Sequence, residues 1–147
     1  MLYRKLHGYK YELAEDFEIF IPLEIPKMIC VDYIQLKPET REGGKGSLLN
    51  IKMGYAWDGA SGPTIDDDTN RTPSLVHDAL YQLMRLGVLD YRAYRSFADR
   101  IFVDLCKNRG MSTFRAEYYY NAVRLFAAVS AKPNNGIEPQ LIIYSAP

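Results

Sequence analysis

The sequence predicts an α+β domain in which an N-terminal antiparallel β-sheet precedes a Gly/Asp-rich loop and three C-terminal helices. Apolar residues recur with a period of two in the first third of the chain, and with a helical period in the second half. Strands that come first and helices that follow favour α+β over alternating α/β. We expect one domain over 1–147, divided into a β-rich part (1–56), a loop (57–71), a helical part (72–131) and a C-terminal tail (132–147).

The β-rich part contains several expected strands. Phe17–Ile25 alternates apolar and polar residues, and Pro22 places this strand at a sheet edge because proline cannot donate to a hydrogen-bond ladder. Between two later strands, Pro38–Ser47 carries three glycines and mixed charges, and we expect a long exposed hairpin loop there. The other strands are expected at Tyr9–Leu13, Val31–Lys37 and Leu48–Tyr55.

Helical periodicity begins after the loop. Thr72 is expected as the N-cap of the first helix, with Pro73 at its first position and Gly87 at its end. Asp90 is expected to cap the second helix, which ends at Gly110. The remaining elements are a third helix, Ser112–Ala131, and a short strand or docking tail, Gln140–Pro147.

Composition argues against several classes of partner and against a membrane location. The 18 basic and 18 acidic residues give a net charge of zero, so no general basic field exists to bind nucleic acid. The two cysteines make neither a metal signature nor a disulfide framework. We expect no transmembrane segment, because no stretch approaches the ~20 apolar residues that one needs, and no secretion by a signal peptide.

A polar group interrupts the first helix. His77 and Asp78 lie in the apolar run "LVHDALYQLMRLG", and Tyr81 shares the face of His77 because residues four apart lie one turn above each other. If the first two helices pack through their apolar faces, Asp99 approaches His77. A buried carboxylate that bonds one imidazole nitrogen leaves the other free to act as a base. A structural core histidine is the alternative.

The preceding loop adds candidate residues. In "WDGASGPTIDDD", Gly59 and Gly62 allow the backbone to approach a ligand closely, and Asp58 and Ser61 bring polar groups. A loop of this length is more often functional than not. The alternative is local, because aspartates favour turns and need no partner in solvent.

Four motifs in order resemble a known family. "WDGASGP", with Trp57 and Ser61, is followed by "HDALY", "ADRIF" and "NAVRLF". Together they resemble the phage- and prophage-encoded domain of unknown function family 1353, over roughly Phe17 to Ala128. The resemblance implies a bacteriophage protein, located in the virion or the host cytoplasm, with phage structural proteins as partners. It implies no activity.

A more distant resemblance suggests an activity. Phospholipases A2, and the parvoviral type in particular, also carry a His-Asp-x-x-Tyr helix after a glycine-rich calcium loop. The resemblance implies that His77 activates a water, Asp99 orients His77, and Tyr81 bonds to Asp99. It also implies that Asp78 binds Ca²⁺. The loop residues Asp58, Gly59 and Gly62 would complete the ion's shell, although the family's loop has more glycines than this one.

Three hypotheses remain open at this stage. The first is a calcium-dependent, phospholipase A2-like ester hydrolase that acts on lipid. The second is an acyl hydrolase with a Ser61–His77–Asp99 triad, although the usual Gly-x-Ser-x-Gly turn is absent. The third is a non-catalytic virion, tail or host-interaction protein, in which the His/Asp network is structural. A site that opens to solvent at His77 favours the enzyme, and a sealed site favours the structural role.

Overall fold

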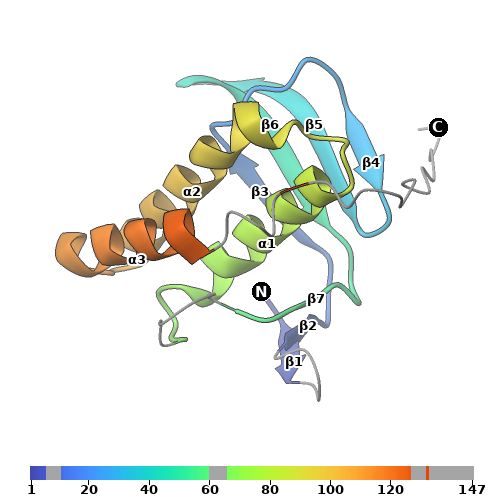
Figure 1. Ribbon diagram of the computed structural model, residues 1–147. Coiled ribbons are helices and arrows are strands. Elements are labelled where there is room, and N and C mark those ends of the chain that lie inside the picture. Colours follow the sequence, from blue (N-terminus) through green and yellow to red (C-terminus); the bar gives the residue numbers. More distant parts are fainter. Residues whose placement is uncertain (6–10, 60–65, 127–131, 133–147) are drawn as a thin grey trace. The chain divides into compact units, whose positions relative to one another are not determined.

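The computed structural model describes residues 1–5, 11–59, 66–126 and 132 (Figure 1). They form two compact units, of which the second begins at Trp57, the point where the expected β-rich part ends. The first unit holds antiparallel sheets and the second holds three helices. The predicted α+β class is therefore confirmed.

Two antiparallel sheets contain the strands. One has the order β1-β2-β7 and the other the order β3-β6-β5-β4. The hairpin of β5 and β6 is the centre of the larger sheet, where Leu36 faces Leu49 and Ile34 faces Ile51, all buried. As Pro22 predicted, β3 is an edge strand. The strands are β1 (Tyr3–Lys5), β2 (Tyr11–Leu13), β3 (Phe17–Ile21), β4 (Ile29–Val31), β5 (Ile34–Arg41), β6 (Gly44–Ile51) and β7 (Ala56–Trp57).

Two expectations about this sheet were wrong. The expected strand Val31–Lys37 is broken by a turn at Asp32, whose φ of 47° lies in the left-handed region that Asp tolerates. The expected long loop Pro38–Ser47 is mostly strand, because β5 and β6 stay paired to their ends and leave only Glu42 and Gly43 as the turn. Polar residues mislead here because most of the outer half of β5 is exposed, so the apolar alternation stops before the ladder does.

The second unit consists of α1 (Arg71–Arg85), α2 (Tyr91–Asn108) and α3 (Thr113–Phe126), with α2 packed against both other helices. The N-cap of α1 is Asn70, not Thr72 as predicted, and its carbonyl accepts from the Ser74 N–H at 2.8 Å. Pro73 is tolerated within this first turn because first-turn N–H groups have no helical acceptor. Asp90 caps α2 as predicted, accepting from two backbone N–H groups.

Helix α1 is buried along most of its length, and its buried residues include the polar side chains of Thr72, Ser74 and His77. Among the described residues, no helix is long and apolar enough to cross a membrane. The described part of α3 ends at Phe126, and the expected continuation to Ala131 lies outside the described residues. The expected C-terminal strand, Gln140–Pro147, lies outside them too.

Candidate functional site

His77 and Asp99 meet in the interior of the helical unit. His77 lies on α1 and is 3% exposed, and Asp99 lies on α2 and is fully buried. The His77 Nε2 atom is 2.8 Å from Asp99 Oδ1, a hydrogen-bonding distance. The expected contact between these helices is therefore confirmed, and Asp99 is an acceptor for one nitrogen of the ring.

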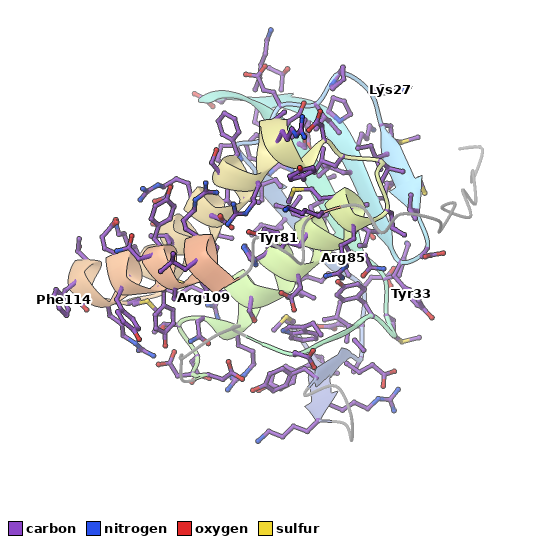
Figure 2. The ribbon with its side chains drawn as sticks, in the orientation of Figure 1. Lys27, Tyr33, Tyr81, Arg85, Arg109 and Phe114 are labelled. Atoms are coloured by element: carbon purple, nitrogen blue, oxygen red, sulfur yellow. The ribbon has the colours of Figure 1, made fainter. Side chains whose placement is uncertain are left out.

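Tyr81 of α1, which is labelled in Figure 2, follows His77 by four residues and is also buried. Its hydroxyl donates to Asp99 Oδ1 at 2.5 Å, as the resemblance to phospholipases implied. Its ring lies 4.0 Å from the His77 ring, centroid to centroid, and the Phe102 ring covers His77 at 5.2 Å. These contacts hold the imidazole in one orientation between aromatic side chains.

Two arginines that sequence reasoning missed approach the other carboxylate oxygen of Asp99. Arg124 of α3 donates from Nη1 to Oδ2 at 2.9 Å, and the Nε of Arg95 lies 3.9 Å from Oδ2. A signal existed for each residue. Arg95 precedes Asp99 by one helical turn, and Arg124 belongs to the "NAVRLF" motif.

The second nitrogen of His77 faces Asp78. Their Nδ1 and Oδ1 atoms are 3.9 Å apart, too far for a direct hydrogen bond. The side chain of Asp78 is 23% exposed, whereas those of His77 and Asp99 are 4% and 0% exposed. The site thus has a buried side, where Asp99 binds Nε2, and a side nearer to solvent, where Nδ1 faces Asp78.

Burial and charge compete in setting the pKa values of this group. Burial lowers the pKa of His77, but its contact with Asp99 and the attraction of the nearby Asp78 and Asp99 carboxylates outweigh burial and leave the pKa raised. Burial raises the pKa of Asp78, despite the neighbouring His77 and the backbone N–H of Asp58. For Asp99 the hydrogen bonds from His77, Tyr81 and Arg124 outweigh burial, so its pKa is lowered. Asp99 is thus held as a carboxylate.

The other expected residues lie in the segment before α1, and the structure describes only some of them. The Trp57 indole N–H donates to Ser74 Oγ at 3.2 Å, so this buried side chain anchors the segment on α1. Asp58 is exposed and contributes its backbone N–H to Asp78. Ser61 and Gly62 lie outside the described residues.

Gly59 fits closely against Asp66, a residue for which sequence reasoning proposed no specific role. The φ of Gly59 is +82°, and a Cβ there would lie 2.5 Å from Asp66 Oδ2. The positive φ favours glycine, and a Cβ at this position would require the Asp66 carboxylate to move. Gly59 therefore serves the packing of the segment on itself.

The described residues do not by themselves fit the expected calcium site. Within ranges 1–5, 11–59 and 66–126, no three His, Cys, Asp or Glu side chains are grouped as a metal ion requires. Calcium sites also use backbone carbonyl oxygens, and the expected contribution of Gly62 lies outside these ranges. The assignment of Asp78, Asp58, Gly59 and Gly62 to Ca²⁺ remains a prediction.

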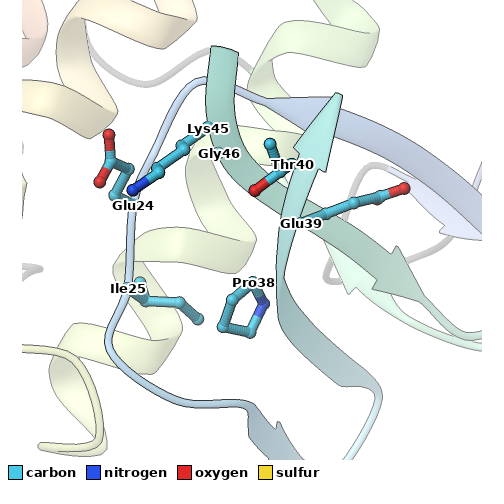
Figure 3. Close-up of a pocket in the computed structure, with 7 residues that line it drawn as sticks. All are labelled: Glu24, Ile25, Pro38, Glu39, Thr40, Lys45 and Gly46. Atoms are coloured by element: carbon cyan, nitrogen blue, oxygen red, sulfur yellow. The ribbon is translucent and has the colours of Figure 1, made fainter. Parts of the chain in front are cut away.

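A pocket of about 160 Å³ lies in the first unit (Figure 3). It lies between the β5–β6 hairpin and the chain that follows β3. The described residues of its lining combine acidic, basic and apolar side chains and include no histidine, so they offer no imidazole base. The residues that line it are Glu24, Ile25, Pro38, Glu39, Thr40, Lys45 and Gly46.

Comparison with family models identifies a match over residues 35–123, with a family described as "Protein of unknown function (DUF1353)". The chain belongs to the DUF1353 family. The DUF1353 match includes all of α1 and α2, and hence His77, Asp78, Tyr81 and Asp99. No curated protein and no solved structure matches this DUF1353 protein.

Proposed function

We propose that this DUF1353 protein is an ester hydrolase in which His77 is the general base and Asp99 orients it. The observation that carries this proposal is the 2.8 Å contact of His77 Nε2 with a buried carboxylate, while Nδ1 lies on the side nearer to solvent. A carboxylate on one nitrogen fixes the proton there and leaves a lone pair on the other. This is the arrangement that a general base needs.

The proposed reaction needs only the imidazole and water as reacting groups. The Nδ1 atom of His77 takes a proton from water as the water oxygen bonds to the ester carbonyl carbon. The tetrahedral intermediate then breaks the carbon–oxygen bond to the leaving alcohol, which takes the proton back from Nδ1. Asp99 stays ionised and stabilises the imidazolium formed between these steps.

A lipid ester is the proposed substrate class, because the His-Asp-x-x-Tyr helix with a distant Asp partner is similar to that of phospholipases A2. The contacts of Tyr81 and His77 with Asp99 support this likeness in geometry. The proposal includes a Ca²⁺ ion with Asp78 as a predicted ligand. The bound ion would polarise the ester carbonyl. No step above is assigned to the ion.

Release of fatty acid from phosphatidylcholine vesicles, and of nitrophenol from short nitrophenyl esters, tests the proposal. We expect His77→Gln to lower kcat/KM by about 10²- to 10⁴-fold, the usual contribution of a general base. His7→Gln replaces the other histidine and is the control. A folded His77→Gln variant that keeps the wild-type rate would refute the proposal, as would a wild-type protein inactive on both ester classes.

Calcium is tested separately. We expect activity to fall in excess chelator and to return when Ca²⁺ is added. Titration calorimetry with CaCl₂ should give a binding signal that Asp78→Asn removes. Activity that is unchanged in chelator would remove the metal from the proposal and leave the His77–Asp99 pair in place.

A second candidate function is favoured by the burial of the site. His77 is 3% exposed and Asp99 fully buried, and the Asp99 carboxylate is bonded by residues of α1 and α3. Such a network can fix a fold without turnover. In this reading the protein is a non-catalytic virion, tail or host-interaction component of a bacteriophage. It predicts that His77→Gln lowers stability and that the wild type shows no hydrolysis.

The serine hydrolase alternative depends on Ser61, which lies outside the described residues. It makes a distinct prediction, because only a nucleophilic serine forms an acyl-enzyme. Mass spectrometry after incubation with a nitrophenyl ester or a fluorophosphonate would show an adduct on Ser61. Hydrolysis without an adduct, unaffected by Ser61→Ala, would assign attack to water.

A further inference from the structure

The Asp99 carboxylate is held by both of its oxygens. Oδ1 lies 2.8 Å from His77 Nε2 and accepts from the Tyr81 hydroxyl at 2.5 Å. Oδ2 accepts from Arg124 Nη1 at 2.9 Å. His77 and Tyr81 belong to α1, and Arg124 comes from α3, so the two oxygens are bonded from opposite neighbours of α2.

A second arginine braces this arrangement. The Nε of Arg95 donates to the Tyr81 hydroxyl at 3.3 Å, and its Nη2 donates to the main-chain carbonyl of Arg124. The side chains of Arg95 and Arg124 are only 17% and 34% exposed. Arg95 therefore ties the Tyr81 side of the carboxylate to the backbone that carries Arg124.

The two oxygens have different chemical consequences. A carboxylate bonded only through Oδ1 could rotate about its Cβ–Cγ bond or take up a proton, and a protonated Asp99 could donate to Nε2. The imidazole proton would then move to Nδ1, the nitrogen that a base must keep free. A cation on Oδ2 opposes both changes, because it fixes the carboxylate plane and favours the charged form.

We infer that Arg124, braced by Arg95, is a positioning residue that fixes Asp99 so that His77 carries its proton on Nε2 and presents Nδ1 as an acceptor. Where it concerns catalysis this inference rests on the proposed function, but the tautomer of His77 is a property of the folded protein without substrate. The sequence motif that contains Arg124 does not indicate what the residue does. Its contact with Asp99 Oδ2 indicates this role.

The tautomer is read from the two imidazole ¹⁵N shifts of His77 in histidine-labelled protein, at a pH where the ring is neutral. We expect wild type to show the Nε2–H form alone, and Arg124→Gln to show a mixture with the Nδ1–H form. Arg124→Lys keeps the charge and should restore most of the Nε2–H form. Arg100→Gln is the matched control, because Arg100 of α2 also bonds α3, through Glu117 at 3.2 Å, away from Asp99.

Kinetics give an independent readout if the protein hydrolyses esters. Arg124→Gln should lower kcat by about tenfold or more with little change in KM, which is part of the ~10²- to 10⁴-fold effect of a general base. Arg100→Gln should change neither. A protein without activity refutes the proposed function but leaves the tautomer experiment intact.

Two outcomes would overturn the inference. The first is a folded Arg124→Gln protein, by circular dichroism, in which His77 is still entirely the Nε2–H tautomer. If Arg124→Gln does not fold, Arg95→Gln replaces it, because loss of the brace should also admit the Nδ1–H form. An unchanged tautomer in folded Arg95→Gln is then the second overturning outcome, and a mixed tautomer supports the inference.

Discussion

Asp99→Asn is the most informative change to the stability of the helical unit. The substitution keeps the size of a side chain that is fully buried, and it removes one negative charge. The amide oxygen can still accept from His77 and Tyr81, but the amide nitrogen would face Arg124 as donor against donor. The guanidinium groups of Arg124 and Arg95 then lose the carboxylate that compensates them.

The magnitude follows from burial. Removing one partner of a buried ion pair costs about 3–5 kcal/mol. The arginine side chains are 17% and 34% exposed and regain some hydration, so the lower end, about 3 kcal/mol, applies. For a chain of this size, that loss corresponds to a fall in Tm of about 6–12 °C.

The assay is urea unfolding followed by tryptophan fluorescence. Trp57 is the single tryptophan, is buried and bonds to Ser74, so its emission reports on the helical unit. Asp104→Asn, on the exposed surface of α2, is the control and should change the free energy of unfolding by less than about 0.5 kcal/mol. A loss below about 1 kcal/mol for Asp99→Asn, at an unchanged m-value, would refute the view that Asp99 is a buried charge centre.

Three further predictions concern other features. The raised pKa of His77 means that its protonated form adds stability that is complete below about pH 6.5 and is lost as pH rises through the folded pKa. The gap in urea midpoint between wild type and His77→Gln should therefore shrink from acidic to alkaline pH. Gly59→Ala should lower Tm by more than Gly87→Ala, because both have positive φ but only Gly59 has Asp66 within 2.5 Å of the added Cβ. Cys106 is buried, which raises its pKa to about 12, so its reaction with a thiol reagent should require denaturant.

The ordered elements were predictable where one face is buried and the other is not. The alternation in β3 and the helical period in α2 indicated their positions, and Asp90 marked the start of α2. The split between β4 and β5 was not predictable from periodicity, because it depends on one left-handed residue, Asp32. The long β5–β6 ladder was missed because its outer half consists mainly of exposed polar residues and glycines, which do not continue the apolar alternation.

The sequence predicted the contacts between α1 and α2 in the candidate site, but not the contact with α3. The spacing of His77 and Tyr81 and the apolar surroundings of Asp99 indicated that the three would meet, because helix geometry is regular. Arg124 could not be placed by such reasoning, since its contact with Asp99 depends on how α3 packs on α2. Polar contacts between helices depend on how the helices pack. Sequence periodicity indicates which face of a helix is apolar, but not which residues of another helix that face will contact.

The three-helix attachment of Asp99 has a consequence for synthesis of the chain on the ribosome. His77 and Asp99 are 22 residues apart, and Arg124 follows Asp99 by another 25. A nascent chain that has released α1 and α2 can pair His77 with Asp99, but the second oxygen of that carboxylate has no guanidinium from α3 until about two dozen more residues emerge. During synthesis the contact between His77 and Asp99 can therefore form before the contact between Arg124 and Asp99. A chain truncated before Arg124 would contain the first contact without the second.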